Sequence, residues 1–264
     1  MTRRLDWADY RTTEYAAIDP SRTIAVLPTA AVEQHGPHLP VGTDMLIAEG
    51  MLATLRATCP ADLDIRILPV QAIGKSNEHL HAPGTLTLSA ETALKAWLEI
   101  GLSVRRAGVR KIVLVNSHGG NLDLISILTR ELRVRAGMLA VKCQWSGFGV
   151  PAGLYSDDEL AYGIHGGAME TSLMLAFRPE TVDMAAARDF ASTARGAAIP
   201  PIGPVSYGWI ASDLNPAGTV GNAAAGTAEK GRATAAHQVA GFVALLGSVA
   251  ATDLAGFDPV LPGF

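Results

Sequence analysis

Four short apolar runs mark the first half of the chain, and each is shorter than a typical helix. They cover residues 23–27 (TIAVL), 64–70 (DIRILPV), 111–115 (KIVLV) and, more weakly, 138–143 (MLAVKC). Runs of this length that are rich in Ile and Val are typical of strands buried on both faces, as in a parallel sheet. We therefore predict four strands at these positions.

Segments with helical spacing separate these runs. Residues 43–59 place apolar side chains at three- and four-residue intervals. Residues 89–107 begin with the helix-starting sequence Ser-Ala-Glu-Thr, and residues 122–136 stop before Gly137. Strand and helix in regular alternation indicate βαβ units, and hence a layered α/β fold.

The remaining sequence shows no boundary between domains. No internal repeat, low-complexity tract or Ser/Pro-rich linker divides it, so we predict a single domain over residues 1–264. Residues 147–163 are rich in Gly and acidic side chains, and residues 197–221 are rich in Gly and Pro. We predict that both are long loops, which often carry function.

Composition narrows the class of protein. Apolar residues make up 48% and charged residues 17% of the chain, which is typical of a globular protein. The formal net charge is -4 and no Lys/Arg stripe is present, which argues against nucleic acid as a partner.

Location follows from the cysteines and the apolar stretches. Only Cys59 and Cys143 are present, without a CxxC pair, which favours a reducing compartment. The basic N-terminus lacks an apolar signal region, and the longest apolar stretch, residues 239–252, is short for a membrane span and broken by glycine. We therefore expect a cytoplasmic protein that does not span a membrane.

The first chemistry-bearing cluster follows the first predicted strand. Glu33 and His35 are two residues apart, so an extended backbone points both to one side, and Asp44 follows where the next helix begins. Carboxylate and imidazole together suit Zn, Mn or Fe better than Ca or Mg. The alternative is a polar loop that enters a helix, with Asp44 as an ordinary residue of its first turn.

Two further clusters lie at other predicted strand and helix ends. His118 stands between a buried strand and a glycine pair, where the backbone can approach an ion closely. Glu170 stands at the start of an apolar helix, where the helix dipole favours a carboxylate, and His165 precedes it by five residues. The alternatives are a hydrogen-bonding turn at His118, an ordinary helix-start Glu170 and a structural His165.

Together the clusters supply three carboxylates and two or three imidazoles. That set is sufficient for two metal ions, which polarise a carbonyl and activate water. The sequence contains no GxSxG elbow and no GxGxxG or phosphate-binding loop, so serine-hydrolase and nucleotide-binding readings lack support.

The same motifs resemble the creatininase (creatinine amidohydrolase) family. The resemblance extends over VEQHGPHLPVGTD, GKSNEHLHAPGTLTL, VNSHGGN, HGGAMETSLML and the late TVGNAAAGTAEKG. It implies a creatininase-like three-layer α/β/α sandwich with a mostly parallel central sheet. It also implies a homohexamer with two divalent ions per subunit, which are Zn, Mn or Fe.

The resemblance also implies roles for single residues. Glu33 and His118 would bind one ion, His35 and Glu170 the other, and Asp44 would bridge both. His165 matches a catalytic histidine that passes a proton to the leaving nitrogen, and we count Glu170 with it as catalytic.

Two positions depart from creatininase proper and argue against creatinine as the substrate. Gly120 stands where creatininase has a Glu, and Ala161 with Tyr162 stands where it has a Trp before the catalytic histidine. The pattern is more similar to a branch of formamide hydrolases, peptide-trimming mycofactocin enzymes, and lactam or cyclic-ketone hydrolases.

The leading prediction is an amidohydrolase that cuts a C–N bond of a small cyclic amide or a formamide. The alternatives are a metallopeptidase that trims a C-terminal dipeptide in the maturation of a peptide-derived cofactor, and a non-catalytic protein held together by metal. We expect a small molecule as substrate.

Other side chains are candidates for contact with that substrate. Trp145 and Trp209 lie in or beside the predicted loops, with Tyr207 next to Trp209, although loop aromatics commonly serve as packing. The resemblance adds Tyr162, and it implies that Glu78 and His79 lie near the active site, with a subunit interface as one location for their segment. We expect Cys143 to be a core residue and His237 to be structural or exposed.

Overall fold

Four parallel strands form the centre of the molecule, which is known here from a computed structural model that describes residues 3–260. The strands β1 (Ile24–Thr29), β2 (Ile65–Ile67), β3 (Lys111–Asn116) and β4 (Leu139–Gln144) lie in the order β2-β1-β3-β4. Every residue of β1 and β3 is buried, as their apolar sequences predict. The four predicted strands and their parallel direction are confirmed.

The second strand is shorter than its apolar run. Beyond Ile67 it is joined to β1 by single hydrogen bonds, from Leu68 N to Val26 O (2.9 Å) and from Gln71 N to Pro28 O (2.9 Å). These donors are three residues apart instead of two, so the backbone carries one extra residue there. Regular pairing therefore stops before the end of the predicted strand.

Three long helices connect the strands where the spacing predicts them. These are α2 (Thr43–Thr58), α3 (Ala90–Arg106) and α4 (Leu122–Ala136). Ser89 caps α3, since its side chain accepts a hydrogen bond from Thr92 N at 3.2 Å. Gly137 ends α4 in the left-handed region at φ 61°.

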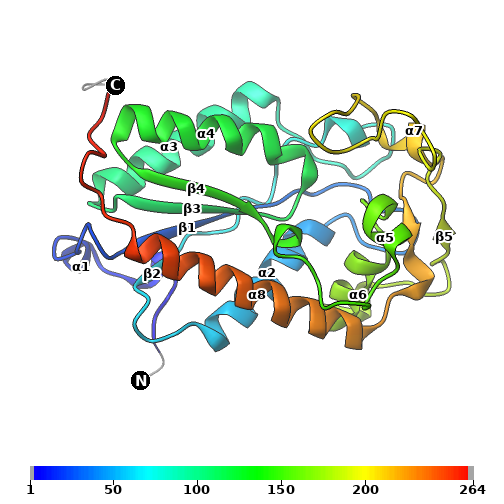
Figure 1. The fold of residues 1–264 in the computed structure, drawn as a ribbon, viewed down its shortest axis with the longest axis horizontal. Helices are drawn as coiled ribbons and strands as arrows, with labels where there is room; N and C mark the ends of the chain where they lie inside the picture. Colours follow the sequence, from blue (N-terminus) through cyan, green and yellow to red (C-terminus); the bar gives the residue numbers. More distant parts are fainter. Residues whose placement is uncertain (1–2, 261–264) are drawn as a thin grey trace.

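Helices cover both faces of the sheet, as Figure 1 shows. On one face α3 and α4 pack against Ala25 and Leu27 of β1 and enclose Trp97. On the other, α2, α6 (Ala168–Phe177) and the C-terminal α8 (Ala228–Ala251) pack against Ile24 and Val26. Alternate residues of β1 thus pack into the hydrophobic cores on opposite faces of the sheet. The predicted three-layer α/β/α sandwich is confirmed.

Shorter elements lie around this sandwich. The two predicted long loops are not wholly irregular, because α5 forms within residues 147–163 and α7 within residues 197–221. A two-stranded antiparallel ribbon, β5 with β6, was not predicted, since each strand has only two residues. The elements are α1 (Thr12–Tyr15), α5 (Asp157–Tyr162), α7 (Ala211–Leu214), β5 (Asp189–Phe190), β6 (Gly221–Asn222) and the 3-10 turns Trp7–Asp9, Asn77–His79, Gly119–Asn121, Trp145–Phe148, Pro179–Thr181 and Ala223–Ala225.

By length and composition, α8 is one helix that could cross a membrane. It has 24 residues, and the mean hydropathy of its most apolar 18-residue window is 1.4. The apolar stretch at residues 239–252, which is short for a span, corresponds to only the second half of this helix. Phe242 and Leu246 are buried in the core shared with α2 and α6, which accounts for the apolar character of that half.

The crossing of α6 and α8 depends on a glycine, which gives a direct test. A Cβ at Gly231 of α8 would overlap the carbonyl of Ser172 in α6, whereas a Cβ at Gly247 of the same helix would meet no described atom within 4 Å. We expect Gly231→Ala to lower the free energy of unfolding by about 1–3 kcal/mol through overpacking. Gly247→Ala should instead raise it by up to about 1 kcal/mol, because Ala favours the helix. Urea unfolding of both variants measures the difference, and equal effects at the two positions would contradict this packing.

Candidate metal centre

The candidate centre lies where β1 and β3 end side by side. Thr29 of β1 pairs with Asn116 of β3, so the segments that follow both strands emerge at the same edge of the sheet. Glu33 and His35 lie on the segment after β1, and His118 lies directly after β3. Asn121 joins the two segments, since its side-chain amide donates to Ala30 O at 3.0 Å.

Two helix starts bring the remaining carboxylates to this edge. Asp44 lies in the first turn of α2, and Glu170 lies in the first turn of α6. Glu170 Oε2 accepts a hydrogen bond from Gly166 N at 2.5 Å. Gly166 has φ +67°, and a Cβ there would overlap the side chain of Thr219, so this turn requires glycine.

The five predicted ligands converge on one space. Asp44 lies between the two imidazoles, with Oδ1 3.3 Å from His35 Nε2 and Oδ2 3.3 Å from His118 Nδ1. Glu33 Oε1 lies 3.2 Å from His118 Nδ1, and Glu170 Oε2 lies 3.7 Å from His35 Nε2. The arrangement therefore has two halves, Glu33 with His118 and His35 with Glu170, which share Asp44.

Several atoms of this cluster lack the partners that buried polar atoms need. Within residues 3–260, both carboxylate oxygens of Glu33, Asp44 Oδ2 and His35 Nε2 are buried without a hydrogen bond. An unpaired buried polar group is costly, and a charged one more so. Cations placed among these oxygens and nitrogens would supply the missing partners.

Both imidazoles are held in the form that a metal ligand requires. His35 Nδ1 lies 3.0 Å from Glu33 O, and His118 Nε2 lies 2.9 Å from Lys75 O. A carbonyl only accepts, so these nitrogens carry the hydrogens, and the lone pairs of His35 Nε2 and His118 Nδ1 face the carboxylates in the neutral rings. The donor set therefore fits divalent ions of the zinc and manganese type.

The electrostatics of the cluster also call for positive charge. Burial lowers the pKa of His35, but Asp44 and the other carboxylates outweigh it and raise that pKa to about 10. The same balance raises the pKa of His118 well above its ordinary value. Burial raises the pKa of Glu170 to about 7. Without metal, protons on the imidazoles balance the carboxylates, and bound cations would displace them.

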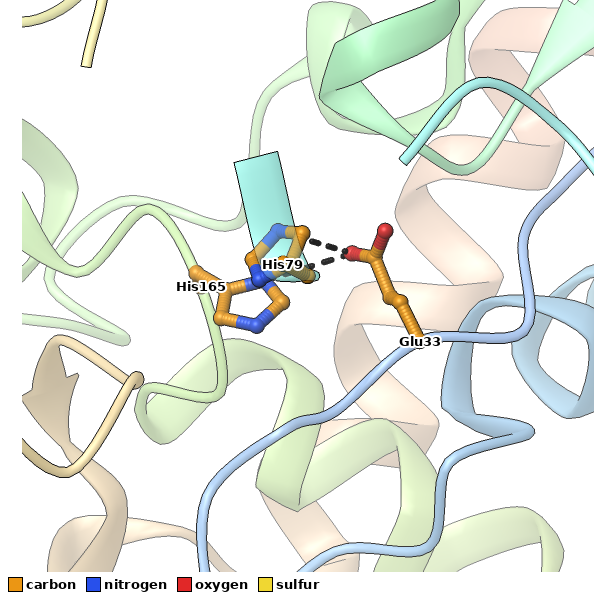
Figure 2. A group of neighbouring side chains, drawn as sticks. All are labelled: Glu33, His79 and His165. Carbon is orange, nitrogen blue, oxygen red and sulfur yellow. Dashed lines mark ion pairs between the residues drawn. The ribbon is translucent and has the colours of Figure 1, made fainter. Parts of the chain in front are cut away.

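Two further histidines face Glu33, as Figure 2 shows. His79 Nε2 lies 3.3 Å and His165 Nδ1 lies 3.6 Å from Glu33 Oε1, and the two rings stack with centroids 4.2 Å apart. Burial lowers the pKa of His79, and burial together with the neighbouring His35 lowers the pKa of His165. Both shifts favour the neutral rings, in which one ring nitrogen of each histidine keeps a lone pair.

A cavity of about 1050 Å³ opens onto this cluster. Of the predicted substrate contacts, Glu78, His79, Trp145 and Trp209 line it. Among the described residues that form its wall Tyr162 is absent, although its neighbour Gly163 is present. Trp145 is 3% exposed and packs edge-on against Phe242, so packing accounts for much of its burial.

Two of these predicted substrate contacts, Glu78 and Trp209, also have defined partners inside the chain. Glu78 Oε1 lies 3.4 Å from His118 Nε2, and Glu78 Oε2 lies 3.2 Å from Lys75 Nζ, so this carboxylate supports a candidate ligand within its own subunit. Trp209 donates from Nε1 to Pro201 O at 2.7 Å. Cys143 is half-buried and packs against the edge of the core, and His237 is exposed, one of the two outcomes expected for it.

Glu159 supports the site by capping a helix, a role that the sequence did not reveal. It belongs to the acidic run Asp157-Asp158-Glu159, which is typical of a solvated surface, yet it is only 6% exposed. Its carboxylate accepts hydrogen bonds from Ala168 N at 2.5 Å and Asn222 N at 2.7 Å. It thereby caps α6, whose own N-cap residue is a glycine, and fixes the turn that carries Glu170.

Comparisons with known proteins agree from sequence and from structure. The family model Creatininase (creatinine amidohydrolase) matches residues 8–246. The mycofactocin precursor peptide peptidase of Mycolicibacterium smegmatis is 32% identical over 60% of this chain and 60% of its own length, and that of Mycobacterium ulcerans is 31% identical over 81% and 80%. Creatinine amidohydrolase of Pseudomonas putida is 31% identical over 68% of this chain and 72% of its own.

Solved structures share the fold. A crystal structure of creatinine amidohydrolase (creatininase) has a TM-score of 0.70 and 25% identity, and the match covers 95% of this chain and 97% of that one. A manganese creatininase and a Zn-Zn form of a creatininase variant, each 24% identical, have TM-scores of 0.69. Their matches cover 94% of this chain and 98% and 97% of theirs.

The cap on α6 can be tested by stability. Glu159→Ala leaves the N–H groups of Ala168 and Asn222 without their acceptor, and we expect a loss of about 1–3 kcal/mol in the free energy of unfolding. Asp158→Ala is the matched control, because that neighbour is exposed and its one ion pair within residues 3–260 is with the exposed Arg195. Its change should stay within about 0.5 kcal/mol. Chemical denaturation of both variants measures this, and an unchanged Glu159→Ala protein would argue against the cap.

Proposed function

This chain belongs to the creatininase family, and we propose that it hydrolyses an amide-type C–N bond at a centre of two divalent ions. The observation that carries the proposal is the set of buried, unpaired atoms of Glu33, Asp44 and His35 that face one space. The cavity that opens onto them favours catalysis over a closed structural metal site. The C–N bond hydrolases among its relatives support the reaction class.

The ligand geometry supports one ion in each half of the cluster. Asp44 directs Oδ2 toward the half with Glu33 and His118, and Oδ1 toward the half with His35 and Glu170, as a bridging carboxylate does. Two divalent ions bound there would polarise a substrate carbonyl and lower the pKa of a nearby water. The donors accept zinc, manganese or iron.

His165 is placed to move the proton that hydrolysis releases. Its Nε2 lies 2.7 Å from Gln34 O, so this nitrogen carries the hydrogen and the Nδ1 lone pair points toward the cluster. In the proposed reaction Nδ1 takes up the proton from the attacking water and returns it to the departing nitrogen. Glu170, held by Gly166 N, serves as a ligand beside it.

The crowding around Gly120 supports a substrate other than creatinine. A side chain at this position would overlap the Glu78 carboxylate and the ring of His118. The Glu that creatininase proper carries there therefore has no room in this chain, and Glu78 occupies the space instead.

The size of the cavity favours a peptide over the small cyclic amide or formamide that the sequence first indicated. Its volume of about 1050 Å³ is at the upper end of pockets for drug-sized ligands and far exceeds one small ring. Its outer wall includes the exposed side chains of Ile202, Tyr207 and Ile210. The peptidase relatives, at 31–32% identity, support the same choice.

Metal dependence is the first test. Chelation should abolish hydrolysis, Zn or Mn should restore it, and elemental analysis should find about two ions per chain. Glu33→Gln should lower kcat at least about 100-fold, because a carboxylate that binds the metal directly matters at least as much as the residues that support it. Glu91→Gln, an exposed acid in α3, is the control that keeps full activity. Unchanged turnover after chelation or in Glu33→Gln would end the proposal.

Substrate size is the second test. Ile202→Trp narrows the cavity and should raise KM for short peptides about tenfold, the equivalent of roughly 1.4 kcal/mol. It should leave the hydrolysis of a small lactam or formamide unchanged. Ile199→Trp is the matched control, because Ile199 is equally exposed but is not among the described residues of the cavity wall. If wild-type protein cleaves lactams or formamidopyrimidines and no peptide, the peptide assignment is wrong.

A further inference from the structure

Gln34, between two of the candidate ligands, has a side-chain amide whose orientation is fixed by backbone groups. Gly36 N donates to Oε1 at 3.0 Å, and Nε2 donates to Gly218 O. A backbone N–H can only donate and a carbonyl can only accept, so the oxygen and nitrogen of this amide cannot be exchanged. Gln34 is 7% exposed, and Gly218, at φ +74°, leaves room for it where a Cβ would overlap the amide.

This amide determines which nitrogen of His79 is protonated. The second hydrogen on Gln34 Nε2 faces His79 Nδ1 at 2.8 Å, so Nδ1 is the acceptor. The neutral ring then carries its hydrogen on Nε2, the atom 3.3 Å from Glu33 Oε1. His79 therefore presents an N–H to Glu33.

The backbone carbonyl of the same residue determines the state of His165. Gln34 O accepts from His165 Nε2 at 2.7 Å, which leaves the lone pair of the neutral ring on Nδ1, 3.6 Å from Glu33 Oε1. Gln34 Nε2 also lies 3.3 Å from His165 Nε2, but both atoms are donors, so this contact is no hydrogen bond. His165 therefore presents a lone pair to Glu33.

Both neutral rings thus carry their hydrogen on Nε2. His79 turns this N–H toward Glu33 Oε1, whereas His165 turns its bare Nδ1 toward the same oxygen. Figure 2 shows both rings directed at Glu33. We propose that Gln34 is the positioning residue that creates this pair, with its side chain setting His79 as a donor and its carbonyl setting His165 as a proton acceptor. The N–H of His79 then faces Glu33 Oε1, while the Nδ1 lone pair of His165 stays available. The catalytic use of that lone pair rests on the proposed function, but the ring orientations do not.

Nitrogen-15 NMR of histidine-labelled, zinc-loaded protein tests the pair without any substrate. In the wild type, both His79 and His165 should be protonated on Nε2 and bare on Nδ1, with His79→Gln and His165→Asn used for assignment. In Gln34→Glu the new carboxylate only accepts, so His79 should gain a hydrogen on Nδ1 while His165 stays unchanged, because its partner is the backbone. A wild-type His79 protonated on Nδ1, or a His165 that changes together with His79, would overturn the proposal.

Turnover and metal content separate positioning from loss of the fold. Gln34→Met removes every hydrogen bond of the amide at similar length, and it should lower kcat about 10–100-fold while zinc content is retained. Gln71→Glu is the control for the chemical change, since that amide donates to Pro69 O at the surface and should leave kcat unchanged. Full turnover in Gln34→Met would contradict the inference. The predicted NMR pattern in a protein without hydrolase activity would refute the proposed function alone.

Discussion

Three carboxylates packed against two imidazoles at the edge of a sheet cannot stay charged without positive charge among them. Glu33 and Asp44 are almost fully buried, and oxygens of both lack hydrogen-bond partners within residues 3–260. Protons on His35 and His118 can balance this charge, which accounts for their raised pKa values. Divalent cations would do so more completely, since the unpaired oxygens of Glu33 and Asp44 and the unpaired nitrogen of His35 are able to bind them directly. The rest of the site is built around this need.

The fold positions these side chains by holding the backbone segments that carry them. The ends of β1 and β3 set the distance between the segments that carry Glu33 and His118, through the register of Thr29 with Asn116. On the other side, the turn before α6 is held by a buried carboxylate from α5. Ligands from rigid strand and helix ends are placed more precisely than ligands from free loops.

Much of the layer structure could be predicted from sequence, because buried β-branched runs and helix-end residues such as Ser89 and Gly137 act locally. Residues of the site that act through distant partners could not. Gln34 gains its role from residues 79, 165 and 218, and Glu159 is hidden in an acidic run that looks solvated. Tyr162 was chosen by resemblance alone, and the backbone there turns a neighbour toward the cavity instead.

The candidate ligands are spread along the chain from Glu33 to Glu170, and this spacing would tie uptake of the proposed ions to the completion of folding. No partial chain that ends before α6 holds all five side chains, so a growing polypeptide would have to finish most of its sandwich before it could retain the proposed ions tightly. Conversely, each unfolding event would release the ions into solution. The stability of the native protein in a cell would therefore depend on the free concentration of the metal, as linkage between binding and folding requires.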